Sequence, residues 1–150
     1  MKIRVATIKD AKRISYLIQK NTDANPNNYS TQQIKAWKKY NTPAQIVKQL
    51  RNRKIFCIFN KNKLVGTIAL ADHTILGLYV SYTVRKKGIG TQLLKHLEAY
   101  AKQNKIKKLT LTSTPSAYKF YLSKGYLSQG KVNLSINGID FLETRMEKTL

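Results

Sequence analysis

Residues 84–91, with the sequence VRKKGIGT, combine three adjacent basic side chains with two glycines. An apolar segment, 76–80, precedes them and an amphipathic segment, 93–101, follows them. A strand that enters a glycine-containing turn and then opens a helix presents free backbone N–H groups and the positive end of the helix dipole. The spacing matches neither the G-x-G-x-x-G dinucleotide turn nor the G-x-x-x-x-G-K-[ST] phosphate loop. The sequence therefore predicts an anion site, of neither common type, that suits a phosphate-bearing ligand.

In this turn Arg85, Gly88 and Gly90 stand at the spacing [QR]-x-x-G-x-[GA], and the stretch resembles the motif of the GCN5-related N-acetyltransferases (GNATs). Downstream, residues 117–126 (AYKFYLSKGY) are similar to a second signature of that family, A-x-x-F-Y-x-x-x-G-[FY]. The first ten residues resemble the opening strand and helix of the family, and the last five resemble its closing strand. The resemblance extends over essentially the whole chain, and it implies the GNAT acyl-CoA N-acyltransferase fold.

The resemblance implies a place for acetyl-CoA. The turn would wrap its pyrophosphate through backbone amides, with basic side chains near the phosphates. The pantetheine chain would lie like an extra strand where the fourth and fifth strands splay apart, bonded by backbone groups of the fourth. The cofactor-binding residues expected on this basis are Leu78, Tyr79, Val80, Arg85, Lys86, Lys87, Gly88, Ile89, Gly90, Thr91 and Tyr118.

The resemblance also implies the reaction, in which an amine attacks the thioester carbonyl directly within a ternary complex. Tyr121 occupies the motif position where the family often carries the general acid, and a phenol with an ordinary pKa of about 10 can protonate a thiolate. For the general base, His73 has a suitable intrinsic pKa, although a lone histidine at the start of a strand is more often structural. Cys57 lies in an apolar segment, so we expect neither a covalent nucleophile nor a metal centre.

The chain carries 28 lysines and arginines against 7 aspartates and glutamates, a net charge of +21. Charge of this size attracts polyanions, so nucleic acid must be considered as a partner. The lysines are spread along the chain rather than gathered in an arginine-rich stripe, so nucleic acid is not the favoured partner. The same excess disfavours a polycationic acceptor, which would need an acidic pocket.

A small-molecule or protein amine is therefore the expected acceptor. Two alternatives stay open at this point. One is an enzyme that acetylates the α-amine of an aminoacyl-tRNA, and the other is a non-catalytic module of the same fold that holds coenzyme A or RNA.

Periodicity and turn signals predict one strand, two or three helices, three strands, a helix, a strand, a helix and two strands. Capping signals at Ser30 and at Thr42 begin two short helices. Thr114-Pro115 begins the helix that carries Tyr121, and Asn137-Gly138 marks a tight hairpin. Alone these patterns support an α/β or α+β domain, and with the resemblance they predict a central mixed β-sheet with helices on both faces.

In the GNAT fold the two short helices lie beside the acceptor site, so Tyr29 and Trp37, with Tyr40, are candidate substrate-binding residues. Packing of Trp37 against the core is an equally good interpretation. We expect a single N-acetyltransferase domain over residues 1–150, as a monomer or homodimer. Because no apolar run is long enough to span a membrane and no signal peptide is recognisable, we expect a cytoplasmic protein.

Overall fold

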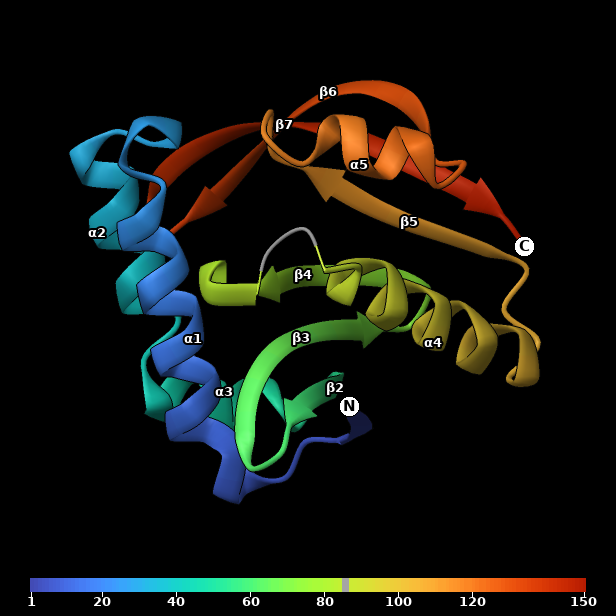
Figure 1. Ribbon diagram of the computed structural model, residues 1–150. Helices are drawn as coiled ribbons and strands as arrows, with labels where there is room; N and C mark the ends of the chain where they lie inside the picture. Colours follow the sequence, from blue (N-terminus) through green and yellow to red (C-terminus); the bar gives the residue numbers. More distant parts are fainter. Residues whose placement is uncertain (85–86) are drawn as a thin grey trace.

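The computed structural model describes residues 1–84 and 87–150, and within these residues seven strands form one mixed sheet. Helices α1 to α3 lie on one face of the sheet, and α4 and α5 lie on the other (Figure 1). The strand order is β1-β2-β3-β4-β5-β7-β6, and every neighbouring pair is antiparallel except β4 and β5. The predicted mixed sheet with helices on both faces is confirmed.

The strands are β1 Lys2–Val5, β2 Lys54–Asn60, β3 Lys63–Ala71, β4 Thr74–Val80, β5 Lys108–Ser113, β6 Leu127–Ile136 and β7 Ile139–Thr149. The α-helices are α1 Ala11–Ala24, α2 Thr31–Tyr40, α3 Pro43–Gln49, α4 Ile89–Gln103 and α5 Tyr118–Ser123. Three short 3-10 helices, η1 Ile8–Asp10, η2 Pro26–Asn28 and η3 Tyr82–Val84, complete the described elements. No helix in the described ranges has the length and apolarity that a membrane span needs.

Successive side chains of the central strands point to opposite faces of the sheet and build a separate core on each face. On β2, Phe56 and Ile58 belong to the core under α4, whereas Ile55 and Cys57 belong to the core under α1 and α3. Burial raises the pKa of the Cys57 thiol to about 12, so this cysteine stays protonated and acts as a small packing residue. The sheet is thereby fixed from both sides, which sets the position of its central strands.

Helix α4 is held by an apolar stripe at helical spacing. Its buried residues are Ile89, Leu93, Leu94, Leu97 and Ala101. Fully burying a side chain such as leucine contributes about 1.5–3 kcal/mol, so this stripe fixes the helix and therefore the turn that precedes it.

Strands β4 and β5 are the only parallel neighbours among the described strands, and they are paired over a short distance. Their register joins Thr74 to Thr110 and Ile75 to Leu111 and ends there. Beyond Ile75, β4 continues to Val80, still paired to β3 on its other side. The sheet is therefore split between β4 and β5 toward the carboxyl end of β4.

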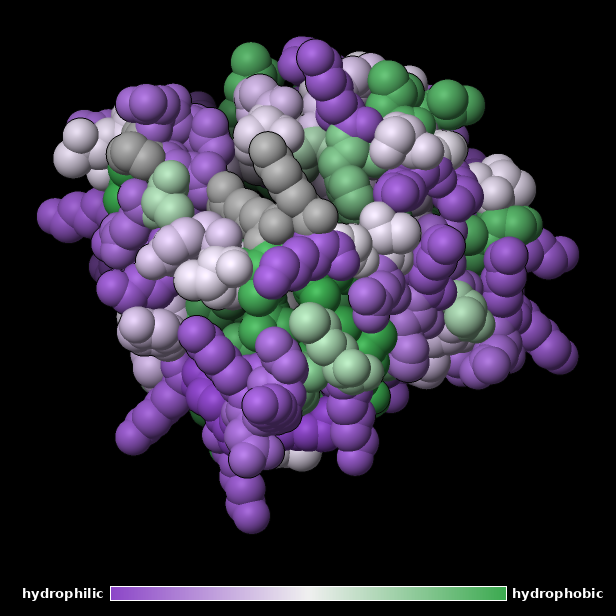
Figure 2. Space-filling model, in the orientation of Figure 1, coloured by the Kyte–Doolittle hydropathy of each residue, from purple (hydrophilic) through white to green (hydrophobic). Residues whose placement is uncertain are grey.

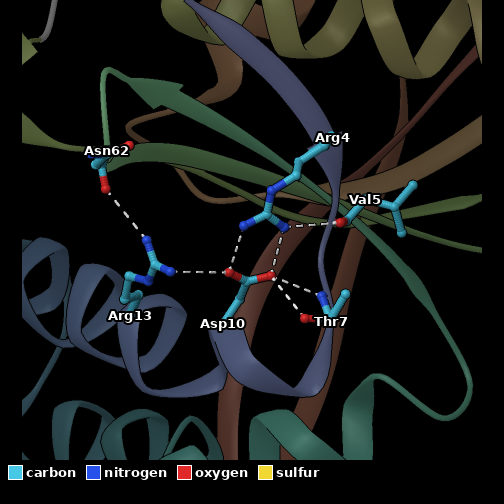
Figure 3. Close-up of polar contacts among 6 residues, drawn as sticks. All are labelled: Arg4, Val5, Thr7, Asp10, Arg13 and Asn62. Atoms are coloured by element: carbon cyan, nitrogen blue, oxygen red, sulfur yellow. Dashed lines mark hydrogen bonds and ion pairs between the residues drawn. The ribbon is translucent and has the colours of Figure 1, made fainter.

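Asp10 ties the first strand to the first helix (Figure 3). Arg4 donates two hydrogen bonds to the Asp10 carboxylate, at 2.8 and 2.9 Å, and the backbone N–H of Thr7 donates a third at 2.8 Å. The hydrogen bonds from Arg4 contribute most to lowering the pKa of Asp10 to about 2. The carboxylate is 1% exposed, so its charge is kept by these donors rather than by water.

The predicted helix starts and the hairpin agree closely with the structure, with one difference. Asn137 and Gly138 have φ of 50° and 77°, as a type I′ turn requires, and join β6 to β7. The helix predicted to begin at Thr114-Pro115 begins at Tyr118 instead, because residues 115–117 form a turn. The hydroxyl of Thr114 and the ring of Pro115 therefore mark the start of that turn rather than of the helix.

Candidate active site

The turn between β4 and α4 ends in a left-handed glycine. Gly88 precedes the helix with φ of 75° and ψ of 12°, a conformation that costs little only for glycine. Its carbonyl oxygen accepts a hydrogen bond from the N–H of Gln92 at 3.0 Å, so the helix begins directly after it. The first-turn N–H groups of α4 lack partners within the helix and lie where an anion gains from the helix dipole.

Gly90 is not required by the packing of the protein. A Cβ at this position would lie 3.5 Å from Cζ of Phe120 and 3.7 Å from Cγ2 of Val80, which are ordinary contacts. The backbone of Gly90 instead lines a cavity. The absence of a side chain therefore leaves room for a ligand to approach the first turn of α4 closely.

The cavity has a volume of about 420 Å³ and joins the turn to β4 and α5. Apolar residues of β4 and α5 form much of its wall, and Tyr121 also borders it. The lining residues are Asn21, Leu78, Val80, Val84, Gly88, Ile89, Gly90, Thr91, Ala117, Phe120 and Tyr121. The cavity thus runs alongside the part of β4 that is not paired to β5.

Tyr121 is held in a fixed orientation by two other rings. Its ring makes edge contacts with Phe120 at 5.3 Å and with Tyr126 at 5.7 Å between centroids. Tyr121 is 6% exposed, and burial, assisted by the charge of Glu143, raises the pKa of its phenol well above the ordinary value. The phenol therefore stays protonated at neutral pH and can act as a proton donor in the cavity.

Glu143, a carboxylate that no sequence motif singled out, lies beside β5. It lies on β7, and the hydroxyl of Thr112 on β5 donates a hydrogen bond to its Oε1 at 3.3 Å. Burial raises the pKa of Glu143 to about 7, an effect that the Thr112 hydrogen bond partly offsets. A carboxylate that titrates near neutral pH is suited to accept and release protons.

Three tyrosines from separate segments lie within electrostatic range of Glu143. Burial raises the pKa of each, and the charge of Glu143 adds to the increase for Tyr29, Tyr79 and Tyr121. For Tyr29 the pKa reaches about 12. The fold thus brings a loop residue, a β4 residue and an α5 residue within electrostatic range of one carboxylate of β7.

The predicted acceptor-side aromatics meet on β7. The ring of Phe141 lies 5.7 Å from that of Tyr29 and 5.9 Å from that of Trp37, and Tyr40 lies 5.8 Å from Trp37. Trp37 also packs against the core under α1 and α3, so its structural role is clear. Tyr29, two residues before α2, is the member of this cluster that lies within the electrostatic range of Glu143.

The structure does not bring His73 to this site. His73 is exposed in the turn before Thr74, at the opposite end of β4 from Gly88. Its neighbour Asp72 borders a separate hollow of about 1090 Å³ at that far end of the sheet. We therefore do not propose His73 as the base.

The remaining predicted cofactor residues divide into three groups. Arg85 and Lys86 lie outside the described residues, and Lys87 is exposed beside Gly88. Leu78 and Val80 line the cavity, whereas the side chain of Tyr79 packs against the core on the other face. Tyr118 packs against the core under α4 at the start of α5.

Phe120 lines the cavity but was not among the predicted cofactor residues. Its place in the second motif was the signal that could have identified it.

Comparison with known proteins fits this geometry. Residues 25–150 match a family model described as an acetyltransferase (GNAT) domain, which covers most of the chain. The fold and this match define the class of protein as an N-acetyltransferase. The chain belongs to the GNAT family and is an enzyme of that family, as its two motifs predicted. Among curated proteins, no sequence matches this chain.

Solved structures share the fold over essentially its full length. A GCN5-related N-acetyltransferase from Rhodopseudomonas palustris gives a TM-score of 0.92 at 24% identity, covering 99% of this chain and 95% of that one. The PaiA N-acetyltransferase from Thermoplasma acidophilum, solved in complex with coenzyme A, gives 0.82 at 19% identity, covering all of both chains. An aminoglycoside 6′-N-acetyltransferase complexed with coenzyme A gives 0.71 at 19% identity, covering 99% of this chain and 97% of that one. At these identities the likeness establishes the fold alone.

Proposed function

We propose that the protein transfers an acetyl group from acetyl-CoA to a primary amine, directly and within a ternary complex. One observation carries the proposal: the split between β4 and β5 holds a cavity that leads from the N-terminus of α4 to Tyr121. Such a cavity offers an anion site at one end and a proton donor at the other. The proposal treats residues 1–150 as one N-acetyltransferase domain.

The residues present fit acetyl-CoA. The first turn of α4 supplies N–H groups for the pyrophosphate, Gly88 and Gly90 leave room for its close approach, and exposed Lys87 adds positive charge. Backbone groups of β4 from Leu78 to Val80 that face the β5 side, where the pairing with β5 has ended, would bond the amides of the pantetheine chain. The structural neighbours solved with coenzyme A support this choice of ligand.

Glu143 and Tyr121 would divide the proton transfers. When bound, acetyl-CoA supplies the acetyl group as a thioester. The carboxylate of Glu143 would accept a proton from the incoming ammonium group, directly or through water, and release the neutral amine that attacks. The Oη of Tyr121 would donate a proton to the departing thiolate as the C–S bond breaks, and would regain one from the proton that the nitrogen loses as the amide forms. The two groups lie close enough for the charge of Glu143 to influence the pKa of Tyr121, as a shared reaction centre requires.

The acceptor side favours an amine attached to an apolar or aromatic group. Tyr29 lies within electrostatic range of Glu143, the carboxylate proposed as the base, and its ring contacts that of Phe141, which in turn contacts Trp37. A polycation would need several carboxylates, and the chain has 7 acidic residues in all. We therefore propose a monoamine, either a small molecule or a protein amino group, as the acceptor.

The test is a thiol-release assay with saturating acetyl-CoA and a panel of amines that spans aliphatic, aromatic, amino-acid and peptide classes. Turnover on one class, lost in Glu143→Gln and retained in Glu147→Gln, would support the assignment. Glu147 is the matched control, because it lies on the same strand and pairs with Lys108 at 3.6 Å. Acetyl-CoA binding without turnover on any class would favour the non-catalytic module instead.

A further inference from the structure

A second groove, of about 880 Å³, lies between α1, the β2–β3 turn and the segment that leaves β4. We call it the basic groove. Its lining includes five basic side chains and, among the described residues, no acidic one. The lining residues are Lys12, Arg13, Tyr16, Leu17, Lys20, Asn21, Asn60, Lys61, Asn62, Lys63, Leu64, Ser81, Tyr82 and Thr83. Figure 2 shows apolar surface near the middle of one face of the molecule, with long hydrophilic side chains around it.

Four of the five cations are available to an anionic partner. Arg13 is engaged by the protein, since it donates to the carbonyl of Asn62 at 3.3 Å and lies 3.8 Å from the Asp10 carboxylate (Figure 3). In the described part of the chain the ammonium groups of Lys12, Lys20, Lys61 and Lys63 form no ion pair. Their charges converge from two segments that lie about forty residues or more apart in the sequence.

Two tyrosines in the groove expose their rings. Tyr16 on α1 is 65% exposed and Tyr82 is 54% exposed. The ammonium of Lys20 lies 5.5 Å from the Tyr16 ring centroid, so a cation is already placed beside a stacking surface. Aromatic rings flanked by lysines bind single-stranded nucleic acid, because bases stack on the rings while the ammonium groups neutralise phosphates.

Amides and hydroxyls fill the space between these groups. Asn60 and Asn62 come from the β2–β3 turn, and the hydroxyls of Ser81 and Thr83 lie 2.9 Å apart at the other side. Such groups can bond base edges and sugar hydroxyls. A lipid surface would need exposed aliphatic side chains on a convex face. The groove is concave, and the two leucines in its lining, Leu17 and Leu64, are buried.

The basic groove adjoins the 420 Å³ cavity proposed to hold acetyl-CoA, because Asn21 lines both and residues 81–83 lead into the turn before α4. We propose that the basic groove binds single-stranded nucleic acid through stacking on Tyr16 and Tyr82 and through phosphate contacts with the four lysines. Binding at this surface goes beyond acetyl transfer and does not depend on it.

Fluorescence anisotropy with a labelled single-stranded RNA of twelve nucleotides, in the absence of acetyl-CoA, tests the proposal. Four phosphate contacts predict a slope of log K against log salt of about −3, and a loss of affinity of about 50-fold between 50 and 200 mM salt. Tyr16→Ala and Tyr82→Ala should each weaken binding by roughly 5-fold to 150-fold at both salt concentrations. Tyr16→Phe, which keeps the ring, should bind nearly as the unmodified protein does.

The lysines have a matched control in Lys9 and Lys102, which are exposed outside the groove. Lys12→Gln with Lys61→Gln should lower the salt slope by about 1.4, whereas Lys9→Gln with Lys102→Gln should leave it unchanged. Equal losses in both pairs, with no effect of the tyrosine substitutions, would overturn the proposal and attribute binding to diffuse charge. Full displacement of the RNA by acetyl-CoA, or tighter binding to anionic vesicles or duplex RNA, would also overturn it.

Discussion

Replacing Glu143 by glutamine should stabilise the protein at high pH while removing its activity. The folded protein raises the pKa of Glu143 from 4.5 to about 7, chiefly through burial. The folded state therefore binds this proton more tightly than the unfolded chain does. The contribution of Glu143 to stability is complete below pH 4.5 and decreases as the pH rises to about 7, above which it stays low.

The size of the effect follows from the pKa change. About 2.5 pKa units at about 1.36 kcal/mol each give roughly 3 kcal/mol of unfolding free energy above pH 8. Glutamine removes the partly buried charge and keeps an oxygen that can accept the Thr112 hydrogen bond. We therefore expect Glu143→Gln to be more stable by roughly 3 kcal/mol at pH 9 and by close to zero at pH 4.

Urea denaturation of the two proteins between pH 4 and pH 9 measures this difference. Glu147→Gln is the control, because the Glu147 carboxylate is paired with Lys108 and its loss should not stabilise the protein. In the same preparations, turnover of Glu143→Gln should fall by about 10²-fold or more, as for loss of a general base. A stability difference that does not change with pH would refute the burial of Glu143, and unchanged turnover would refute its catalytic role.

Three further substitutions test other parts of the site and fold. Tyr121→Phe should leave acetyl-CoA affinity nearly intact and lower turnover by roughly 10²-fold, and unchanged turnover measured by thiol release would reduce Tyr121 to a packing role. Gly90→Glu should abolish acetyl-CoA binding in calorimetry with little change in thermal stability, because its Cβ meets only ordinary contacts in the protein; normal binding by a folded variant would remove the pyrophosphate from this turn. Asp10→Asn should lower the urea unfolding free energy by about 2 kcal/mol at pH 7, through loss of the Arg4 hydrogen bonds, and this deficit should shrink as the pH falls toward 2; a deficit that persists at pH 2 would contradict the charge assignment.

Local patterns were sufficient for most of the fold. Ser30 and Thr42 accept the hydrogen bonds expected of helix caps, and Asn137-Gly138 forms the expected turn, because each depends on neighbours within a few residues. The observed start of α5 differs from the predicted one, because Thr114-Pro115 is as compatible with a turn as with a helix start.

The site was harder to predict because it depends on contacts between distant segments. In sequence, Glu143 is a charged residue in an alternating strand, which usually indicates a solvated face. It is only partly exposed because it lies on the strand that α2 packs against, two residues after the buried Phe141. His73 directly precedes β4, whereas the turn at Gly88 follows the other end of that strand. The length of β4 therefore separates His73 from the site. Neither fact is encoded within a short window of residues.

The most direct test of the central claim is calorimetric titration of nucleic-acid-free protein with acetyl-CoA at low and high salt. We expect saturable binding to one site per chain that persists at high salt, because backbone amides and the apolar walls of the split contribute along with charge. Binding that disappears at high salt and is matched by an unrelated polyanion would contradict it, since the net charge of +21 alone would then explain the affinity.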